Sequence, residues 1–507
     1  MGEQIQVLQT GDENWEEKYS IPQEISWHYI NLNTQLPSEK EEGRTFDVVL
    51  LEGEVNPDRL SFLRKAGRPY TYFLTENLVM TGVLKRLLAD KKARKIRVQD
   101  IQQFIERIPF AYYPGQEGRK IGIREMEISK PFVSNAEYDG NRAVRLSIDT
   151  EGRNRQVLFL KYNISFNIYA ERGMELWPEY SAEGSIALQF KIKLFKRGMA
   201  DELLWSRTAE EKDFEKPLRI SEKDAGYLTV QILARGAGRL EIGPFHFRSS
   251  RAGAGQFLPG GQRHAARDRG EVLSYFDPGD RKPPLIVYFS GYRTAEGFEG
   301  NGIMRGLGTP FLLLGDPRLE GGGFYLGERD YEEKIVSIIR DTMNSLRFDS
   351  NQLILSGLSM GTFGAVYYGC TLSPHAIVIG KPLMNLGTVA ANERRLRPGG
   401  FPTSLDVLRM ATGGIGTEQE DMLNRRLWNK FDLADFKDTI FSVAYMFQDD
   451  YDSGAYQDIL THLEEKGISI VGKGLEGRHN DNTAGIVSWF LSQLRRILRQ
   501  DFYREVS

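Results

Sequence analysis

The amino-acid sequence predicts an α/β protein whose carboxy-terminal part forms a doubly wound, mostly parallel sheet. Three observations along its 507 residues lead to this prediction. Strand and helix signals alternate over residues 1–115, short alternating strand patterns recur over 118–250, and continuous apolar strands alternate with helices over 255–507. We therefore predict a small α/β domain, then an antiparallel β-sandwich, then a doubly wound domain with helices on both faces of its sheet.

The composition is that of a globular protein, and it narrows the function classes. The 66 lysines and arginines nearly balance the 69 aspartates and glutamates, so the net charge of −3 gives no general attraction to nucleic acid. Cys370 is the single cysteine, which excludes an intrachain disulfide and a multi-cysteine metal site. The amino terminus lacks the basic and apolar segments of a signal peptide, and no apolar run approaches the length of a membrane span. We expect a cytoplasmic protein.

Four segments of the first part carry clear secondary-structure signals. Residues 46–53 form an apolar run typical of a buried strand, and residues 58–67 follow as a helix. Residues 69–77 are predicted to form a second strand, and residues 78–96 an amphipathic helix. This βαβα order indicates a parallel sheet. No glycine-rich phosphate fingerprint follows either strand, so we assign no nucleotide.

Three aromatic residues of the predicted sandwich, Trp177, Tyr180 and Trp205, allow two interpretations. Sandwiches of this kind often bind sugars on exposed aromatic rings, because a ring offers a flat apolar surface. Such rings more often fill the core or lie under a neighbouring domain. We favour this second interpretation.

Residues 248–270 mark the clearest change of composition along the chain, because glycine and arginine are frequent there. A cluster of arginines could bind an anionic partner. We favour a solvated connection between domains, which is the usual role of a stretch rich in glycine and polar residues.

The third part contains Gly357-Leu358-Ser359-Met360-Gly361, which matches the pattern G-x-S-x-G. An apolar strand precedes it and a helix-compatible segment follows, as a nucleophilic serine on a strand-to-helix turn requires. In such a turn, Cβ atoms at positions 357 and 361 would collide with the adjacent backbone, which explains the glycines. Ser359 is therefore the predicted nucleophile, and a serine in an ordinary glycine-rich loop is the alternative.

A serine hydroxyl needs a base within hydrogen-bonding distance, and the chain has six histidines. In the order serine, acid, histidine, the base lies past the last strand of the sheet. His479 alone satisfies this condition, and an ordinary structural role for it is the alternative. The other five lie in other domains or the linker, follow the serine too closely, or sit within a predicted helix: His28, His246, His264, His375 and His462.

The base in turn needs a carboxylate that fixes its tautomer, and we expect this acid on the loop after the penultimate strand. Three aspartates lie there. Asp449, nearest to the strand end, is our first choice for the acid. Asp450 is the second choice, and Asp452 is the third candidate.

Two backbone N–H groups complete the predicted site as donors to an oxyanion. One is that of Met360, the residue after the nucleophile. The other is that of Gly291, in the loop after the strand at 285–289. A glycine there lets the backbone approach the substrate closely, although a plain glycine turn would use the same residue.

These residues together predict acyl transfer through a serine acyl-enzyme. Water and a sugar hydroxyl can both resolve such an intermediate, so the residues leave esterase and transferase open. We predict no permanently bound cofactor and no metal. The sequence contains no clear coenzyme A motif, so the acyl donor is unassigned.

The third part, with the segments "YFSGYR", "GLSMG", "QDDYD" and "GRHNDN", resembles the α/β-hydrolase fold. Nearly the whole chain, including "GTPFLLLGDPRLEGGGFYLG", resembles the second of the Asp proteins of the accessory Sec secretion system. The serine, acid and histidine of that family fall on Ser359, Asp449 and His479.

This resemblance implies a cytoplasmic protein of Gram-positive bacteria that acts with the first and third Asp proteins and an accessory Sec motor ATPase. The implied substrate is an exported serine-rich-repeat glycoprotein adhesin, whose N-acetylglucosamine residues the protein would acetylate. Peripheral contact with the membrane through the translocon is also implied. Two alternatives stay open: a non-catalytic scaffold or glycan-binding subunit of the accessory Sec complex, and a carbohydrate esterase.

Overall fold

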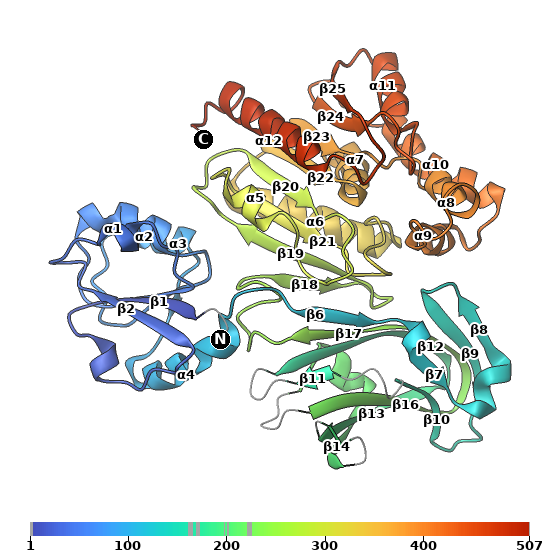
Figure 1. Ribbon diagram of the computed structural model, residues 1–507, viewed down its shortest axis with the longest axis horizontal. Coiled ribbons are helices and arrows are strands. Elements are labelled where there is room, and N and C mark those ends of the chain that lie inside the picture. The colour runs from blue at the N-terminus through green and yellow to red at the C-terminus, as the bar shows by residue number, and fades with distance from the viewer. Residues whose placement is uncertain are drawn as a thin grey trace.

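The computed structural model of the protein describes residues 4–160, 166–168, 173–196, 198–199, 202–220 and 226–505. Its strands form four sheets that follow one another along the chain. Figure 1 shows the amino-terminal sheet on the left in blue, the next two sheets below in teal and green, and the largest sheet above in yellow to red. The mixed α/β class predicted from the sequence is confirmed, and the domain boundaries stay a prediction.

The first sheet is parallel and has the strand order β2-β1-β3-β4-β5. Its strands are β1 (Ile5–Thr10), β2 (Ile25–Ile30), β3 (Val48–Leu51), β4 (Tyr72–Leu74) and β5 (Arg94–Lys95). Helices α2 (Leu60–Ala66) and α3 (Gly82–Asp90) pack on one face and α4 (Ile101–Ala111) on the other, while α1 (Glu39–Glu42) buries no side chain. The four predicted segments correspond to β3, α2, β4 and α3.

Two antiparallel six-stranded sheets come next and enclose one apolar core. One contains β7 (Met126–Ile128), β10 (Arg155–Leu160), β11 (Phe166–Ile168), β13 (Ala187–Lys196), β14 (Leu203–Glu210) and β16 (Gly226–Arg235). The other contains β6 (Gly118–Ile121), β8 (Ala136–Asp139), β9 (Ala143–Asp149), β12 (Met174–Gly184), β15 (Leu218–Ile220) and β17 (Ala237–Ser249). Buried and partly exposed side chains alternate along β13, as the period of a strand with one buried face requires. The predicted run "QVLFLKYNISFNIYA" extends from β10 into 161–165 and 169–170, outside the described residues.

The largest sheet has the order β18-β19-β21-β20-β22-β23-β24-β25 and carries the predicted site. Its strands are β18 (Gln262–Ala265), β19 (Glu271–Asp277), β20 (Leu285–Phe289), β21 (Phe311–Gly315), β22 (Leu353–Leu358), β23 (Ala376–Gly380), β24 (Ile440–Met446) and β25 (Ile470–Leu475). In this order, each strand from β21 across to β25 pairs in parallel with its neighbour. In contrast, β19 pairs antiparallel with both β18 and β21.

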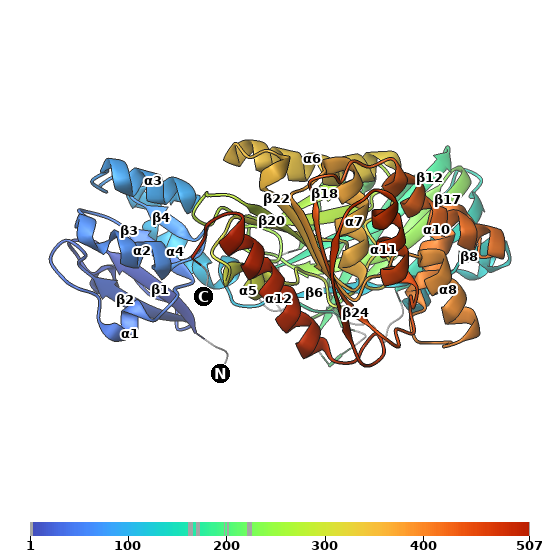
Figure 2. The same ribbon diagram turned by 90° about the horizontal axis from the view of Figure 1, so that it is seen from above.

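Helices cover both faces of this sheet. On one face lie α6 (Arg329–Leu346), α7 (Met360–Leu372) and α11 (Ala455–Glu465), and on the other α5 (Asn301–Arg305) and α12 (Thr483–Gln500). Figure 2 shows α6 and α12 on opposite sides of the strands. Successive residues of one strand therefore enter different cores, with Leu355 facing α6 and α7 and Ile354 facing α12.

Three further helices are inserted between β23 and β24: α8 (Leu386–Arg395), α9 (Thr403–Thr412) and α10 (Thr417–Asp432). Figure 1 shows α9 beside the ends of β8 and β9 of the two-sheet part. Asp406 on α9 accepts hydrogen bonds from the backbone N–H and the side-chain amide of Asn141 at 2.9 and 3.2 Å. The inserted helices are thus attached to the turn between β8 and β9.

The glycine- and arginine-rich stretch 248–270 is not a solvated connection, so our favoured interpretation was wrong. Arg248 and Arg251 are only 1% and 2% exposed. Arg248 pairs with Glu296 at 2.6 Å and with Glu271 at 2.7 Å, and Arg251 donates to main-chain carbonyls within residues 111–115. A guanidinium can be buried when carboxylates and carbonyls satisfy it, and those partners are distant in sequence.

The aromatic residues of the sandwich have structural roles, as we favoured. Trp177 is buried, and the guanidinium carbons of Arg263 and Arg269 lie 4.0 and 3.8 Å from its ring centre. Tyr180 and Trp205 pack against the sandwich core.

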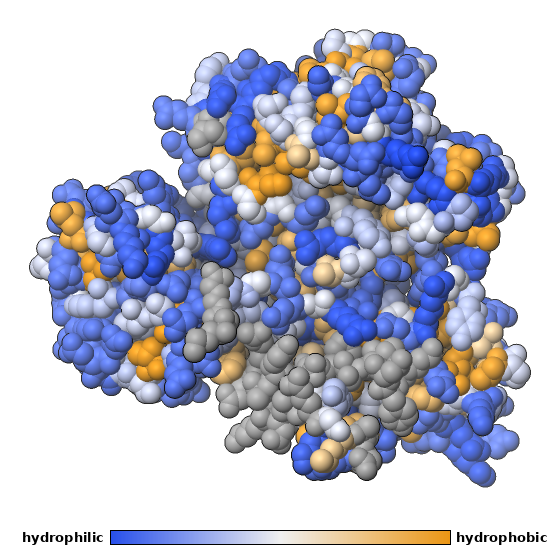
Figure 3. Space-filling model, viewed as in Figure 1, coloured by the Kyte–Doolittle hydropathy of each residue, from blue (hydrophilic) through white to orange (hydrophobic). Residues whose placement is uncertain are grey.

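The molecular surface is mostly hydrophilic on the face that Figure 3 shows, with separate hydrophobic patches on the amino- and carboxy-terminal parts. Leu433 and Tyr503 are examples of single, strongly exposed apolar side chains. Among the residues that the structure describes, no helix combines the length and the apolar content needed to cross a membrane.

Candidate active site

Ser359 stands at the sharp turn between β22 and α7. Its φ of 51° and ψ of −120° are a combination that residues with a side chain rarely adopt. The Ser359 N–H donates to Gly380 O at 2.9 Å, and the Ser359 carbonyl accepts from the Thr362 N–H at 3.0 Å. The strand-to-helix turn expected from the G-x-S-x-G pattern is present, at the carboxyl end of a central strand.

The two glycines of the pattern allow the backbone to pass closely. A Cβ on Gly357 would lie 2.5 Å from the carbonyl carbon and oxygen of Gly361. A Cβ on Gly361 would lie 2.0 Å from Phe289 O on the neighbouring strand β20. Both obstacles are backbone atoms, which cannot rotate away as a side chain can. The expected collision at 357 and 361 is confirmed.

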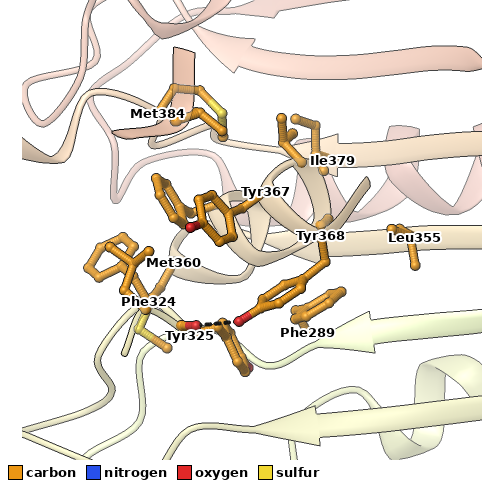
Figure 4. Packing of buried hydrophobic residues seen from close by; sticks show 14 of the residues in the cluster. Phe289, Phe324, Tyr325, Leu355, Met360, Tyr367, Tyr368, Ile379 and Met384 are labelled. Carbon is orange, nitrogen blue, oxygen red and sulfur yellow. Dashed lines mark hydrogen bonds between the residues drawn. The ribbon is translucent and has the colours of Figure 1, made fainter. Parts of the chain in front are cut away.

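An aromatic core lies behind the turn, and Figure 4 shows its packing around Met360. The Tyr368 hydroxyl donates to Tyr325 O at 2.7 Å, and the rings of Tyr368 and Phe289 stack with centres 5.8 Å apart. Phe289 also meets Tyr325 edge-to-face at 5.0 Å. Because these residues come from β20, the loop before α6, and α7, their contacts fix the elements that hold Ser359.

His479 and Asp449 meet Ser359 at the carboxyl ends of the strands. Ser359 Oγ lies 2.8 Å from His479 Nε2, and His479 Nδ1 lies 2.8 Å from Asp449 Oδ2. His479 belongs to the loop after β25 and Asp449 to the loop after β24, and both side chains are buried. When Nδ1–H donates to the carboxylate, Nε2 is free to accept the serine proton. The structure brings together the three residues chosen from the sequence.

Hydrogen bonds keep Asp449 ionised. Its Oδ1 accepts from the backbone N–H groups of Tyr451 at 2.8 Å and Asp452 at 3.1 Å. Burial alone would raise the pKa of Asp449, but the hydrogen bond and charge of His479, together with the two amides, outweigh burial and lower the pKa. The carboxylate is therefore negative at neutral pH, as stabilising an imidazolium requires.

Asp450 and Asp452 contact other groups. Asp450 Oδ1 accepts from the backbone N–H of His479 at 3.1 Å, so it holds the loop and not the ring. Asp452 Oδ2 accepts from the backbone N–H groups of Met384 and Asn385, both at 2.7 Å, and burial raises its pKa to about 6. Among the three aspartates, Asp449 faces the imidazole.

An aromatic stack that the sequence did not suggest fixes the plane of the imidazole. The Tyr451 ring is parallel to that of His479, with centres 4.3 Å apart and planes 4° apart. The guanidinium carbon of Arg397 lies 3.6 Å from the Tyr451 ring centre. Two groups so close to one ring cannot share a face without colliding, so Tyr451 lies between Arg397 and His479. The available sequence signal was the position of Tyr451 beside the acid, in "QDDYD".

The two predicted oxyanion donors differ in availability. Met360 is the first residue of α7, so its N–H has no acceptor within the helix. The Gly291 N–H donates to Glu299 Oε2 at 2.6 Å, so this predicted donor already has an acceptor. A carboxylate on this amide excludes an oxyanion while the contact lasts. Among the residues that the structure describes, the next amide, Tyr292 N–H, has no acceptor.

The other five histidines contact side chains away from Ser359. Their partners were not readable from the sequence because each comes from another segment. They are His28 with Gln6, His246 with Glu296, His264 with Ser274, His375 with Asp501, and His462 with Asp432.

Known proteins match this chain over its full length. A family model described as "Accessory Sec system GspB-transporter", which represents the second Asp protein, matches residues 5–504. The chain is 37% identical over 512 residues to the second Asp protein of the accessory Sec system of Streptococcus gordonii, with all of both chains covered. It is 36% identical over 521 residues to the protein of the same name from Staphylococcus aureus (strain NCTC 8325 / PS 47), covering 99% of this chain and 98% of the relative.

A solved structure agrees in fold over the same extent. It is described as the Glycosylation Associate Protein (Gap123) complex from Streptococcus agalactiae, and the matching chain is 37% identical. The TM-score is 0.88, with all of both chains covered. Sequence and structure therefore agree that the chain belongs to the family of the second Asp protein of the accessory Sec system.

Proposed function

We propose that this protein is a serine acyltransferase that acetylates a sugar hydroxyl on a glycoprotein exported by the accessory Sec system. The observation that carries the proposal is the hydrogen-bonded series from Ser359 through His479 to Asp449 at a strained turn. Strained backbone and buried charge each destabilise a fold. Their concentration around one serine hydroxyl is what covalent catalysis requires.

In the proposed reaction Ser359 Oγ attacks the acyl carbon of the donor while His479 Nε2 takes the hydroxyl proton. Asp449 stabilises the imidazolium, and the Met360 N–H donates to the oxyanion. The donor's leaving group departs with the proton from His479, which leaves an acyl-enzyme. An acceptor hydroxyl then gives its proton to His479 and takes the acyl group, and Ser359 recovers its proton.

The second oxyanion donor lies on the loop after β20 in this proposal. Gly291 can serve once Glu299 moves away from its N–H, and Tyr292 N–H can serve without that movement. We propose N-acetylglucosamine residues of a serine-rich-repeat adhesin as the acceptor class, as the family resemblance implies. The α/β-hydrolase character of the largest sheet belongs to the same proposal.

Replacing the nucleophile tests the proposal. We expect Ser359→Ala, expressed in place of the native protein, to abolish acetylation of the exported glycoprotein as measured by mass spectrometry. Ser492→Ala is the matched control, because Ser492 is an exposed serine on α12 and contacts Trp489 O. Unchanged acetylation in Ser359→Ala would contradict the proposal. Hydrolysis of an acyl ester without transfer to sugar in vitro would favour a carbohydrate esterase.

Assembly with other accessory Sec proteins is a second proposed function, supported by the full-length similarity to a chain of the Gap123 complex. We propose the first and third Asp proteins and the accessory Sec motor ATPase as partners, in the cytoplasm and in peripheral contact with the translocon. A pull-down with Ser359→Ala separates the two functions. Retained partners with lost acetylation would show a bifunctional protein, whereas lost partners would show that Ser359 is structural.

A further inference from the structure

Tyr292 presents an exposed aromatic ring at the edge of the candidate active site. It follows Gly291 in the loop after β20, and 41% of its surface is exposed. The backbone of Gly291 lies against the residue before the nucleophile, since a Cβ on Gly291 would be 3.2 Å from Leu358 O. The loop that carries Tyr292 therefore contacts the segment that carries Ser359. The contact is between Gly291 and Leu358, the residues that directly precede Tyr292 and Ser359.

The Tyr292 ring is held in place although it is exposed. A Cβ on Gly321 would lie 2.1 and 2.2 Å from two carbon atoms of the ring, so the ring packs directly on the backbone at 321. An edge-to-face contact with Phe401, with centres 5.4 Å apart, gives a second support. A side chain that is fixed before a ligand arrives loses little conformational entropy on binding. This combination of exposure and fixed position suits a binding platform.

Tyr292 is the outer end of an aromatic row that leads to the imidazole and consists of Tyr292, Phe401, Tyr451 and His479. The rings of Phe401 and Tyr451 are nearly parallel, with centres 5.6 Å apart and planes 10° apart, and Tyr451 stacks on His479. The four rings come from four separate loops. Tyr292 is the exposed member of this row, because Phe401, Tyr451 and His479 are buried.

The chemistry of this exposed ring suits a sugar. A pyranose ring has flat faces of C–H groups and a rim of hydroxyls, so an aromatic face binds it without a counter-charge. The acceptor arrives from solvent, where Tyr292 is exposed, and must bring one hydroxyl to His479 Nε2. We infer that Tyr292 is the platform on which the acceptor sugar stacks, an assignment that rests on the acyl-transfer function proposed above.

On this platform the acceptor oxygen forms a bond to the acyl carbon, and its proton passes to His479 Nε2. The bond between the acyl carbon and Ser359 Oγ then breaks, and the proton moves from His479 to Oγ. Tyr292 takes no part in proton transfer. It fixes which hydroxyl is presented and raises the local acceptor concentration against competing water.

The experiment measures the KM of purified full-length variants for a glycopeptide that carries N-acetylglucosamine. p-Nitrophenyl acetate is the acyl donor, and its burst of p-nitrophenol counts the sites that form an acyl-enzyme. We expect Tyr292→Leu and Tyr292→Ala to raise the acceptor KM about tenfold, with a smaller change in kcat, because one aromatic contact is lost. Tyr292→Phe keeps the ring and should stay within about twofold of the parent.

Tyr503→Ala is the matched control, because Tyr503 is an 89% exposed tyrosine near the carboxy terminus. An unchanged acceptor KM in both Tyr292→Leu and Tyr292→Ala overturns the platform. So does a KM increase confined to p-nitrophenyl acetate, which would place the ring against the donor.

If the parent protein releases p-nitrophenol no faster than Ser359→Ala, the proposed function is contradicted, and the platform is then decided by direct binding. Calorimetric titration of the glycopeptide into Ser359→Ala and into the double variant Ser359→Ala/Tyr292→Leu compares their affinities. A loss of about tenfold in the double variant supports the platform. Equal affinities, or no binding to either protein, overturn it.

Discussion

Asp449 and Asp450 are neighbours in the chain but contact different atoms of the same histidine. Asp449 accepts from the imidazole Nδ1, whereas Asp450 accepts from the backbone N–H. The first contact determines the tautomer and the charge of the ring, and the second determines only the position of the loop. The two carboxylates can therefore be distinguished by amide substitution.

We expect Asp449→Asn to lower kcat for p-nitrophenyl acetate hydrolysis by about 10⁴, because an amide cannot stabilise the imidazolium and favours the wrong tautomer. Asp450→Asn still offers a carbonyl oxygen to the His479 N–H, so its kcat should fall less than about tenfold. Steady-state kinetics on both variants provide the measurement. The reverse ranking would assign the acid to Asp450.

The serine, acid and histidine could be predicted because each follows a strand of the largest sheet in a fixed order, so chain position alone restricts the choice. Tyr451 and Glu299 could not be predicted in the same way. Their roles arise from a ring stacked on an imidazole and a carboxylate on the Gly291 amide. Such contacts depend on how two loops pack, and no spacing rule encodes them.

The turn between β22 and α7 depends on close contacts between backbone atoms. Gly361→Ala would place a Cβ 2.0 Å from Phe289 O, so either α7 or β20 must move. We expect its free energy of unfolding in urea to fall by about 1–3 kcal/mol, together with a loss of ester hydrolysis. Gly302→Ala on α5 is the control, because its Cβ would meet nothing within 4 Å, and its stability should be unchanged or slightly higher. Parent-like activity in Gly361→Ala would show that the close approach is not needed.

Strands that are apolar on both faces were predictable, whereas elements of mixed composition were not. The strands β20, β21, β22 and β23 are fully or nearly fully buried, and their sequences are continuous apolar runs. β18 (Gln262–Ala265) is partly exposed at the sheet edge and has no apolar pattern. α4 contains Pro109, which weakens the helical signal of its sequence.

At the scale of the whole molecule, a buried group of charges joins the sandwich to the largest sheet. His246 on β17 contacts Glu296 through Nδ1 and Glu179 through Nε2, and Arg248 pairs with Glu296 and Glu271. Burial alone would lower the pKa of His246, but the charge of Glu296 and the hydrogen bonds to Glu179 and Glu296 raise it overall.

This raised pKa predicts a pH-dependent stability. A histidine with a raised folded-state pKa contributes stability that is full below its ordinary pKa of 6.5 and is lost as the pH rises through the folded-state pKa. We expect the free energy of unfolding in urea to fall as the pH rises above the ordinary histidine pKa of 6.5, and His246→Gln to flatten this dependence. His462→Gln, on the surface of α11, is the control and should keep the parent slope. An identical slope in His246→Gln would rule out His246 as its source.

The separation of Ser359 and His479 by 120 positions also sets when the site can exist during protein synthesis. A ribosome adds about 5–20 residues per second, so Ser359 is synthesised roughly 6 to 24 s before His479. Throughout that interval the growing chain has a nucleophile without its base. Because His479 follows the last strand of the sheet, any chain that stops before β25 would lack the proposed activity. Acyl transfer would begin only once almost the entire protein has been translated.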